Sequence, residues 1–118
     1  AQWARDLDNP TNAAFVETFE AKYGYAPSLY ASQGYDTALI LDAALAEAGT
    51  AEADALSAAL KSTEMETTRG DFRFGSNNFP VQDFYLVEAV EMDGQYVMQS
   101  VRKVFEDAVD AYAADCRM

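Results

Sequence analysis

The chain has 118 residues, the length of a single domain that can bury a hydrophobic core. Half of its residues are hydrophobic, which excludes a disordered acidic tail, and its net charge of −12 argues against nucleic acids and anionic membranes as partners. It has no histidine and therefore lacks the commonest general base and the commonest metal ligand. Its one cysteine, Cys116, can form no disulfide within the chain.

The first predicted helix begins at Pro10 and ends at Gly24. Asn9 can cap this helix because its side chain can accept hydrogen bonds from first-turn amides, and a proline suits the first helical position because no amide partner is needed there. Glycine readily takes the left-handed conformation that follows a helix. An apolar stripe recurs every four residues along the segment, at Phe15, Phe19 and Tyr23.

A second helix is predicted from about residue 35 to residue 48, with an earlier turn at Ser28. It is apolar almost all round, so we expect a buried core helix. Asp36 lies at its predicted start, where a carboxylate can cap the first turn, and this role is favoured over a direct contact with a ligand. A third helix is predicted between Gly49 and Ser62.

The hydrophobic pattern changes its period in the second half of the chain. Phe72 and Phe74 alternate with charged residues, which predicts a strand. Two further strands, at 84–92 and 95–104, flank Asp93-Gly94, a residue pair favoured in tight hairpin turns. The sequence therefore predicts a single strand followed by a β-hairpin.

A terminal helix is predicted from Glu106 and Asp107 to about Cys116, with Arg117 favourably placed at its end. The expected fold class is thus α/β, with three helices, a strand, a β-hairpin and a terminal helix. Such a set would make an awkward independent domain, because the first two helices have no preceding strand on which to pack. We therefore expect the N-terminal portion of the fold to be absent from this chain.

A longer signature surrounds the predicted start of the second helix. The run Tyr30-Ala31-Ser32-Gln33-Gly34-Tyr35-Asp36-Thr37-Ala38 follows Lys22-Tyr23-Gly24 and Pro27. Other segments accompany it in order: Trp3, Asp8-Asn9-Pro10-Thr11-Asn12, Phe15-Val16, Phe19, Ala58-Ala59-Leu60 and Arg69-Gly70-Asp71-Phe72-Arg73-Phe74. Together they resemble the C-terminal part of a type I periplasmic solute-binding protein, and more narrowly the branched-chain amino acid receptors of ABC importers. The segments 77–85 and 110–118 resemble a subgroup assigned to aromatic acids.

The resemblance implies a division of the chain within a two-lobed α/β fold. Residues 1–27 would end lobe two, residues 28–75 would return to lobe one, and residues 76–118 would form a hinge crossing, the hairpin and the terminal helix. The whole protein would capture a small amino acid or aromatic acid in the periplasm and deliver it to an ABC permease, without catalysis and without a cofactor. This chain alone is expected to bind the solute weakly or not at all, because one side of the clamp is absent.

Four residues of the signature are the candidate ligand contacts: Tyr30, Ser32, Gln33 and Tyr35. In the family this segment edges the cleft between the lobes. Tyrosine rings can stack on an apolar or aromatic ligand while their hydroxyl groups fix a polar end. The alternatives are that the two tyrosines pack beneath the hinge, and that Ser32 and Gln33 serve in a cap or turn.

Two other functions are open at this stage. A chain with half a core exposes apolar surface, so a non-catalytic module that forms a homodimer or higher oligomer is the main alternative. An acidic hydrolase with a carboxylate pair is disfavoured because the acidic pairs fall on predicted solvent faces. The sequence has no calcium loop, phosphate-binding glycine loop or metal-ligand cluster.

Overall fold

The structure, a computed structural model, describes residues 1–116. The predicted role of Arg117 at a helix end lies outside the described residues. The elements in chain order are α1 (Pro10–Tyr23), α2 (Leu29–Ala48), α3 (Ala53–Ser62), β1 (Glu64–Thr67), β2 (Gly70–Phe74), β3 (Pro80–Met92), β4 (Gln95–Ala108) and a short 3-10 helix (Ala113–Asp115).

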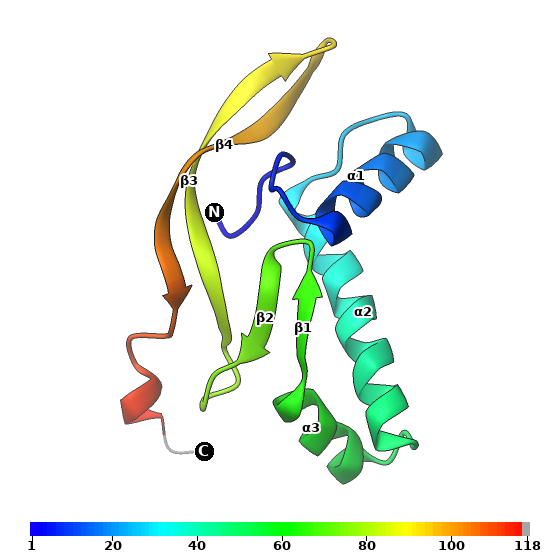
Figure 1. Cartoon of the computed structure of the whole chain (residues 1–118), viewed down its shortest axis with the longest axis vertical. Helices are drawn as coiled ribbons and strands as arrows, with labels where there is room; N and C mark the ends of the chain where they lie inside the picture. The colour runs from blue at the N-terminus through cyan, green and yellow to red at the C-terminus, as the bar shows by residue number, and fades with distance from the viewer. Residues whose placement is uncertain (117–118) are drawn as a thin grey trace.

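The strands form one antiparallel sheet in the order β1-β2-β3-β4. β3 and β4 form a long twisted ribbon on one side of the molecule, and α2 runs down the other side (Figure 1). The short strands β1 and β2 and the N-terminal segment lie between them (Figure 1). The fold is thus the predicted mixture of helices and antiparallel strands.

The N-terminal segment is a central part of the structure. The Ala1 amino group donates to the carbonyl of Tyr85 over 2.8 Å, and the Tyr85 amide donates to the carbonyl of Ala1 over 2.7 Å. A few residues later the Arg5 amide donates to the carbonyl of Met98 over 3.1 Å. This segment therefore runs beside both long strands, from β3 to β4.

Trp3 anchors the segment in the core. Its ring is buried against Phe15 and Val16 of α1, and its indole nitrogen donates to Asn12 Oδ1 over 2.8 Å. The amide group of Asn12 in turn donates to the carbonyl oxygens of Arg5 and Leu7, each over 3.0 Å. One buried asparagine thus joins α1 to the segment that precedes it, with all of its donors used.

The first helix has the predicted ends. The side chain of Asn9 accepts from the Asn12 amide, Pro10 begins α1, and Gly24 follows it in the left-handed conformation at φ 74°. The second helix begins earlier than its predicted main body, at Leu29, because Ser28 caps it by accepting from the Ala31 amide. The capping role predicted for Asp36 is therefore wrong, since Asp36 lies two turns inside α2.

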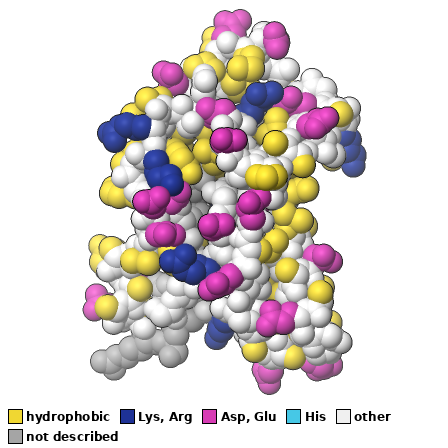
Figure 2. All heavy atoms as spheres, in the orientation of Figure 1, with side chains coloured by type: hydrophobic (Ala, Val, Ile, Leu, Met, Phe, Trp, Pro, Cys, Tyr) yellow, Lys and Arg dark blue, Asp and Glu magenta, His cyan; other side chains and the backbone are white. Residues whose placement is uncertain are grey.

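The expectation of a helix buried all round is also wrong. α2 buries one stripe only, at Ser32, Asp36, Ile40 and Ala44. Leu41 and Leu45 stay exposed, because no other element of the described chain covers that side. Figure 2 shows hydrophobic side chains along the edge formed by α2, beside acidic side chains spread over the visible face.

The sheet has one strand more than the sequence predicts. β1 pairs with β2 from Glu64 opposite Arg73 to Thr67 opposite Gly70. It was missed because its four residues carry no apolar alternation, and only Thr67 among them is buried. Its charged side chains suit a short strand at the edge of a sheet.

The predicted terminal helix is wrong. β4 continues through the predicted helix start as far as Ala108, with Phe105 paired to Phe84 and Ala108 paired to Gln82. The acids at this point do not face a helix terminus: the Asp107 amide donates to Asp83 Oδ1 over 2.9 Å. Pairing with β3 satisfies backbone groups that a helix would otherwise satisfy. Within the part of the predicted helix that the structure describes, a single helical turn remains, Ala113–Asp115.

Candidate functional site

The four candidate ligand residues lie on the first two turns of α2, and the helix separates them. Tyr30 is 79% exposed and Tyr35 38% exposed, whereas Ser32 is fully buried. Gln33 is partly buried, and its carbonyl accepts from the Thr37 hydroxyl. Because residues three apart share a helix face, Tyr30 and Gln33 point to one side, while Tyr35 turns toward α1. Tyr30, Gln33 and Tyr35 are thus at least partly exposed to solvent, whereas Ser32 is not.

Ser32 belongs to a polar network beneath the surface. Its hydroxyl lies 2.7 Å from the hydroxyl of Thr68, in the turn between β1 and β2. Both side chains are fully buried. This contact fixes the start of α2 against the sheet.

Asp36 is the centre of the same network. Its Oδ1 accepts from the Thr68 amide and its Oδ2 accepts from Arg69 Nε, both over 2.8 Å. Arg69 also donates to Gln82 Oε1 over 2.7 Å and lies over the ring of Phe72. The Arg69 side chain is only 9% exposed, so this ion pair is shielded from water. It joins α2, the β1–β2 turn and β3 at one point.

A groove runs between α1 and the exposed start of α2. Its volume is about 300 Å³, and its lining is mostly apolar and aromatic. Tyr35 packs on Phe15 with ring centroids 4.9 Å apart, and Phe19 packs on Tyr23 with centroids 4.6 Å apart. The groove therefore presents ring edges and faces, the surface on which a flat apolar molecule can stack. The residues that line it are Phe15, Thr18, Phe19, Lys22, Tyr23, Ala31 and Tyr35.

Lys22 is the one charged residue in this lining. Its ammonium group lies 5.4 Å from the centroid of the Tyr23 ring. It takes part in none of the ion pairs among residues 1–116. A cation at the rim of an aromatic groove suits a ligand that carries a ring and a negative charge.

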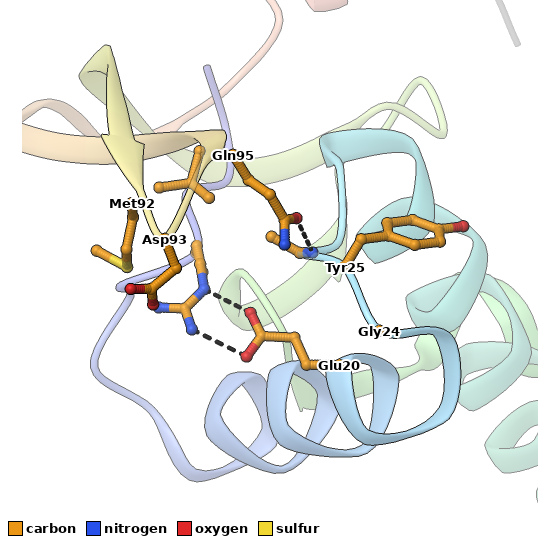
Figure 3. A pocket seen from close by; sticks show the side chains of 9 residues that line it. Glu20, Gly24, Tyr25, Met92, Asp93 and Gln95 are labelled. Carbon is orange, nitrogen blue, oxygen red and sulfur yellow. Dashed lines mark hydrogen bonds and ion pairs between the residues drawn. The ribbon is translucent and has the colours of Figure 1, made fainter.

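A second, polar pocket of about 210 Å³ lies at the tip of the β3–β4 ribbon (Figure 3). Arg5 crosses it and donates to both carboxylate oxygens of Glu20, over 2.7 and 3.0 Å. The hydrogen bond to Glu20 and the negative charges nearby raise the pKa of Arg5 above its usual value, although burial opposes this. Asp93 and Gln95 approach from the ribbon (Figure 3). Of the charged groups here, Arg5 and Glu20 are already paired with each other.

Metal chemistry and paired-acid chemistry find no support in the described part of the chain. Within residues 1–116, no cluster of three histidine, cysteine, aspartate or glutamate side chains could hold a metal ion. Glu17 and Glu64, from two of the acidic stretches, are exposed. Across the same residues, no helix is long and apolar enough to cross a membrane.

Sequence reasoning gave no site role to Arg69 or Lys22. One signal pointed to Arg69: an aspartate on the inner side of an apolar helix needs a cationic or hydrogen-bonding partner. The chain has eight basic residues, and nothing in the pattern selects among them. The sequence places Lys22 on the first helix, but it does not show that the second helix packs beside Lys22, because that depends on the tertiary structure.

Known proteins bear out the resemblance. The model of a family described as periplasmic binding protein matches residues 1–95. A solute-binding protein of an ABC transporter from R. palustris, solved in complex with benzoate, is 34% identical over 99% of this chain, with a TM-score of 0.82. One from Rhodopseudomonas palustris BisB5, in complex with 3,4-dihydroxybenzoic acid, is 26% identical over 93% of this chain, with a TM-score of 0.81. A leucine-binding protein from Thermotoga maritima shares the fold at 20% identity and a TM-score of 0.70. No curated protein matches the chain.

The chain spans about a third of these solved proteins, covering 32% of the benzoate-bound protein and 31% of the dihydroxybenzoate-bound one. The matched part of their fold includes α1, α2 and the ribbon, which here frame both the aromatic groove and the polar pocket. From the family match and the shared structure, the chain belongs to the periplasmic binding protein family of ABC transporter solute receptors and corresponds to a fragment of their type I fold.

Proposed function

We propose that this chain is part of an extracytoplasmic, periplasmic receptor that binds an aromatic carboxylate, with a small amino acid as the other solute class, and passes it to an ABC permease. The role is capture of a solute, and we assign no catalytic residue and no cofactor. The observation that carries the proposal is the aromatic groove between α1 and α2, with Tyr35 in its lining and Lys22 at its rim. The groove offers stacking surfaces for a ring and one unpaired cation for a carboxylate.

Tyr30, Gln33 and Tyr35 are the proposed direct contacts, and Ser32 supports them from beneath. Tyr35 belongs to the groove, whereas Tyr30 and Gln33 extend the same helix start on its outer side. Ser32 is hydrogen bonded to Thr68 and has no exposed surface. A contact between Ser32 and the solute would require that bond to open, so its role here is to hold the helix start in place.

Hinge closure is the proposed mechanism, with residues 1–27 and 28–75 in different lobes and residues 76–118 crossing between them. The support is the side-by-side run of the segment 1–6, β3 and β4, held by the bonds between Ala1 and Tyr85 and between Arg5 and Met98. Adjacent extended segments of this kind can bend together while the elements at either end stay rigid. Solute that contacts both lobes would favour the closed state.

The proposal is tested by following the amide and aromatic signals of the ¹⁵N-labelled chain during titration with benzoate. We expect saturable shifts confined to the groove and the start of α2, with a dissociation constant in the millimolar range, because this chain spans only about a third of the benzoate-bound receptor and so lacks most of the clamp. Benzyl alcohol, which keeps the ring and lacks the carboxylate, is the matched control and should bind more weakly. Absence of shifts at the groove, or equal responses to the two compounds, would contradict the assignment of the groove as the solute site. Tight stoichiometric binding would contradict the expectation that this chain alone binds the solute weakly.

Self-association is the second candidate function. It is favoured by apolar side chains along the β3–β4 ribbon, where Leu86, Val101 and Phe105 are about half exposed or more. Exposed apolar surface of this kind promotes contact with a second copy. Sedimentation velocity across a hundredfold concentration range tests it: a homodimer or larger oligomer is expected, and a monomer at every concentration would rule it out.

A further inference from the structure

The tip of the β3–β4 ribbon touches the loop between α1 and α2 through one side chain. Gln95, the first residue of β4, accepts a hydrogen bond of 2.9 Å at Oε1 from the backbone amide of Ala26. The two residues are 69 positions apart in the sequence. Figure 3 shows the Gln95 side chain reaching across the pocket toward this loop.

The ring of Tyr25 packs the loop on Phe19 and Tyr23 of α1, and hydrogen bonds add few other ties. Its first residue, Gly24, bonds back to Glu20 in α1, and its last, Ser28, bonds forward to the amides of Ala31 and Ser32 in α2. Among residues 1–116, the bond from Ala26 to Gln95 is the hydrogen bond that ties the loop to a distant part of the chain. Ser32 and Asp36 hold α2 against the turn between β1 and β2, and the bond from Ala26 to Gln95 adds a separate restraint on the loop that leads into the first turn.

A second contact braces the same region. Arg5 holds Glu20, in the last two turns of α1, through two hydrogen bonds, while the Arg5 backbone amide bonds to Met98 of β4. The end of α1 and the ribbon are thus both tied to the N-terminal segment. With α1 held in this way, Ala26, in the middle of the loop, is the point at which the loop is hydrogen bonded to the ribbon.

These contacts surround a cavity instead of filling it. The pocket of about 210 Å³ between the ribbon tip and the loop is lined by polar, charged and apolar groups together (Figure 3). A junction held by hydrogen bonds across a cavity opens more readily than one held by close apolar packing. The ribbon tip and the loop can therefore separate while the core stays folded.

We propose that Gln95 is a positioning residue for the solute site: through Ala26 it restrains the loop that leads into α2, and with it the helix start that carries Tyr30 and Gln33. This inference rests on the function proposed above, because the position of this helix start matters for function only if Tyr30 and Gln33 contact the solute. Gln95 does not contact the solute. It makes the ribbon tip and the helix start move as one when the hydrogen bond is closed, and lets the helix start fray when it is open.

Hydrogen exchange of individual backbone amides tests the inference on the chain itself. Gln95→Ala removes the acceptor, so the Ala26 amide should exchange about tenfold faster, with a smaller increase at Ala31 and Ser32. Gln95→Glu keeps an acceptor oxygen at the same reach and should restore most of the protection. Gln99→Ala is the matched control, because Gln99 is exposed on the same strand and its side chain makes no hydrogen bond within residues 1–116.

Two results would overturn the inference. One is unchanged exchange at Ala26 in Gln95→Ala, and the other is faster exchange at Ala26 with no change at Ala31 and Ser32, since the bond would then position nothing. Benzoate titration of the same samples separates the two proposals. If benzoate leaves the wild-type signals unchanged, the solute assignment fails, while the exchange result still decides the role of Gln95. If benzoate binds the wild type, Gln95→Ala should bind it at least threefold more weakly.

Discussion

The carboxylate of Asp36, which has no exposed surface, accepts a 2.8 Å hydrogen bond from Nε of Arg69, and this ion pair joins the inner side of α2 to the turn between β1 and β2. The second carboxylate oxygen accepts from the Thr68 amide. Both charges are removed from water, so each depends on the other. This pair holds the inner side of α2 against the sheet, behind the proposed solute contacts.

Removal of the carboxylate should destabilise the chain strongly. Asp36→Ala leaves the Arg69 guanidinium buried without a counter-charge and the Thr68 amide without an acceptor, so we expect a loss of about 3–5 kcal/mol in the free energy of unfolding. Asp36→Asn keeps an acceptor for Thr68 and should cost less. Urea unfolding followed by circular dichroism measures both. Asp42→Asn, an exposed acid on the same helix, is the control and should stay within about 0.5 kcal/mol of the wild type.

The sequence predicted elements well where the signal is local. Asn9, Pro10 and Gly24 marked the ends of α1 correctly, and Asp93-Gly94 marked the hairpin turn, because caps and turns depend on neighbouring residues. The predicted terminal helix failed because acids at Glu106 and Asp107 favour a helix start only when no partner strand is available. Here β3 supplied that partner.

The candidate site was predictable in part for the same reason. The sequence indicated an early turn at Ser28 but placed the main body of the helix from about residue 35, so Tyr30 and Gln33 were expected before that body and not on the first two turns of α2. Periodicity could not predict that Asp36 faces Arg69, since that pairing joins elements 33 positions apart. It could not predict the exposure of Leu41 and Leu45 either, because an apolar helix is covered only where another element packs on it.

Lowering the pH should reduce the stabilisation that the Asp83 carboxylate provides between β3 and β4. Burial raises the pKa of Asp83, but hydrogen bonds from Lys103, the Asp107 amide and Tyr85 outweigh it and leave the pKa below its usual value. A lowered folded pKa means that the ionised form is stabilised by folding. This stabilisation is fully present above the unfolded pKa of about 4 and is lost as the pH falls through the folded pKa.

The measurement is the free energy of unfolding of wild type and Asp83→Asn between about pH 7 and pH 2. The variant should be less stable at pH 7, and the gap should narrow below about pH 4, where the wild-type carboxylate becomes protonated. Glu88→Gln, an exposed acid on β3, controls for the change in net charge. A gap that stays constant over the whole range would show that Asp83 acts through packing instead of charge.

The hairpin turn should be sensitive to its glycine. Asp93 and Gly94 both have positive φ, 51° and 78°, as in a type I′ turn, and side chains with a branched Cβ disfavour this conformation. Gly94→Val should therefore cost about 1–2 kcal/mol in the free energy of unfolding. Gly34→Ala is the contrasting control: Gly34 is helical, and an added Cβ there meets nothing within 4 Å. That variant should gain up to about 1 kcal/mol. Equal effects of the two variants would contradict the role of positive φ.

Lys22 should set the preference for a carboxylate in the groove between α1 and α2. Lys22→Ala removes the single cation in the lining, so the affinity for benzoate should fall about two- to fivefold, the range expected for an exposed ion pair. The affinity for benzyl alcohol should stay nearly constant, because ring stacking on Phe15 and Tyr35 is untouched. Raising the salt concentration should weaken benzoate binding to the wild type and leave the variant almost unaffected. Lys61→Ala, which removes an exposed lysine from the end of α3, is the matched control. Equal losses for the two compounds would mean that Lys22 shapes the groove through its methylene chain and contributes no charge recognition.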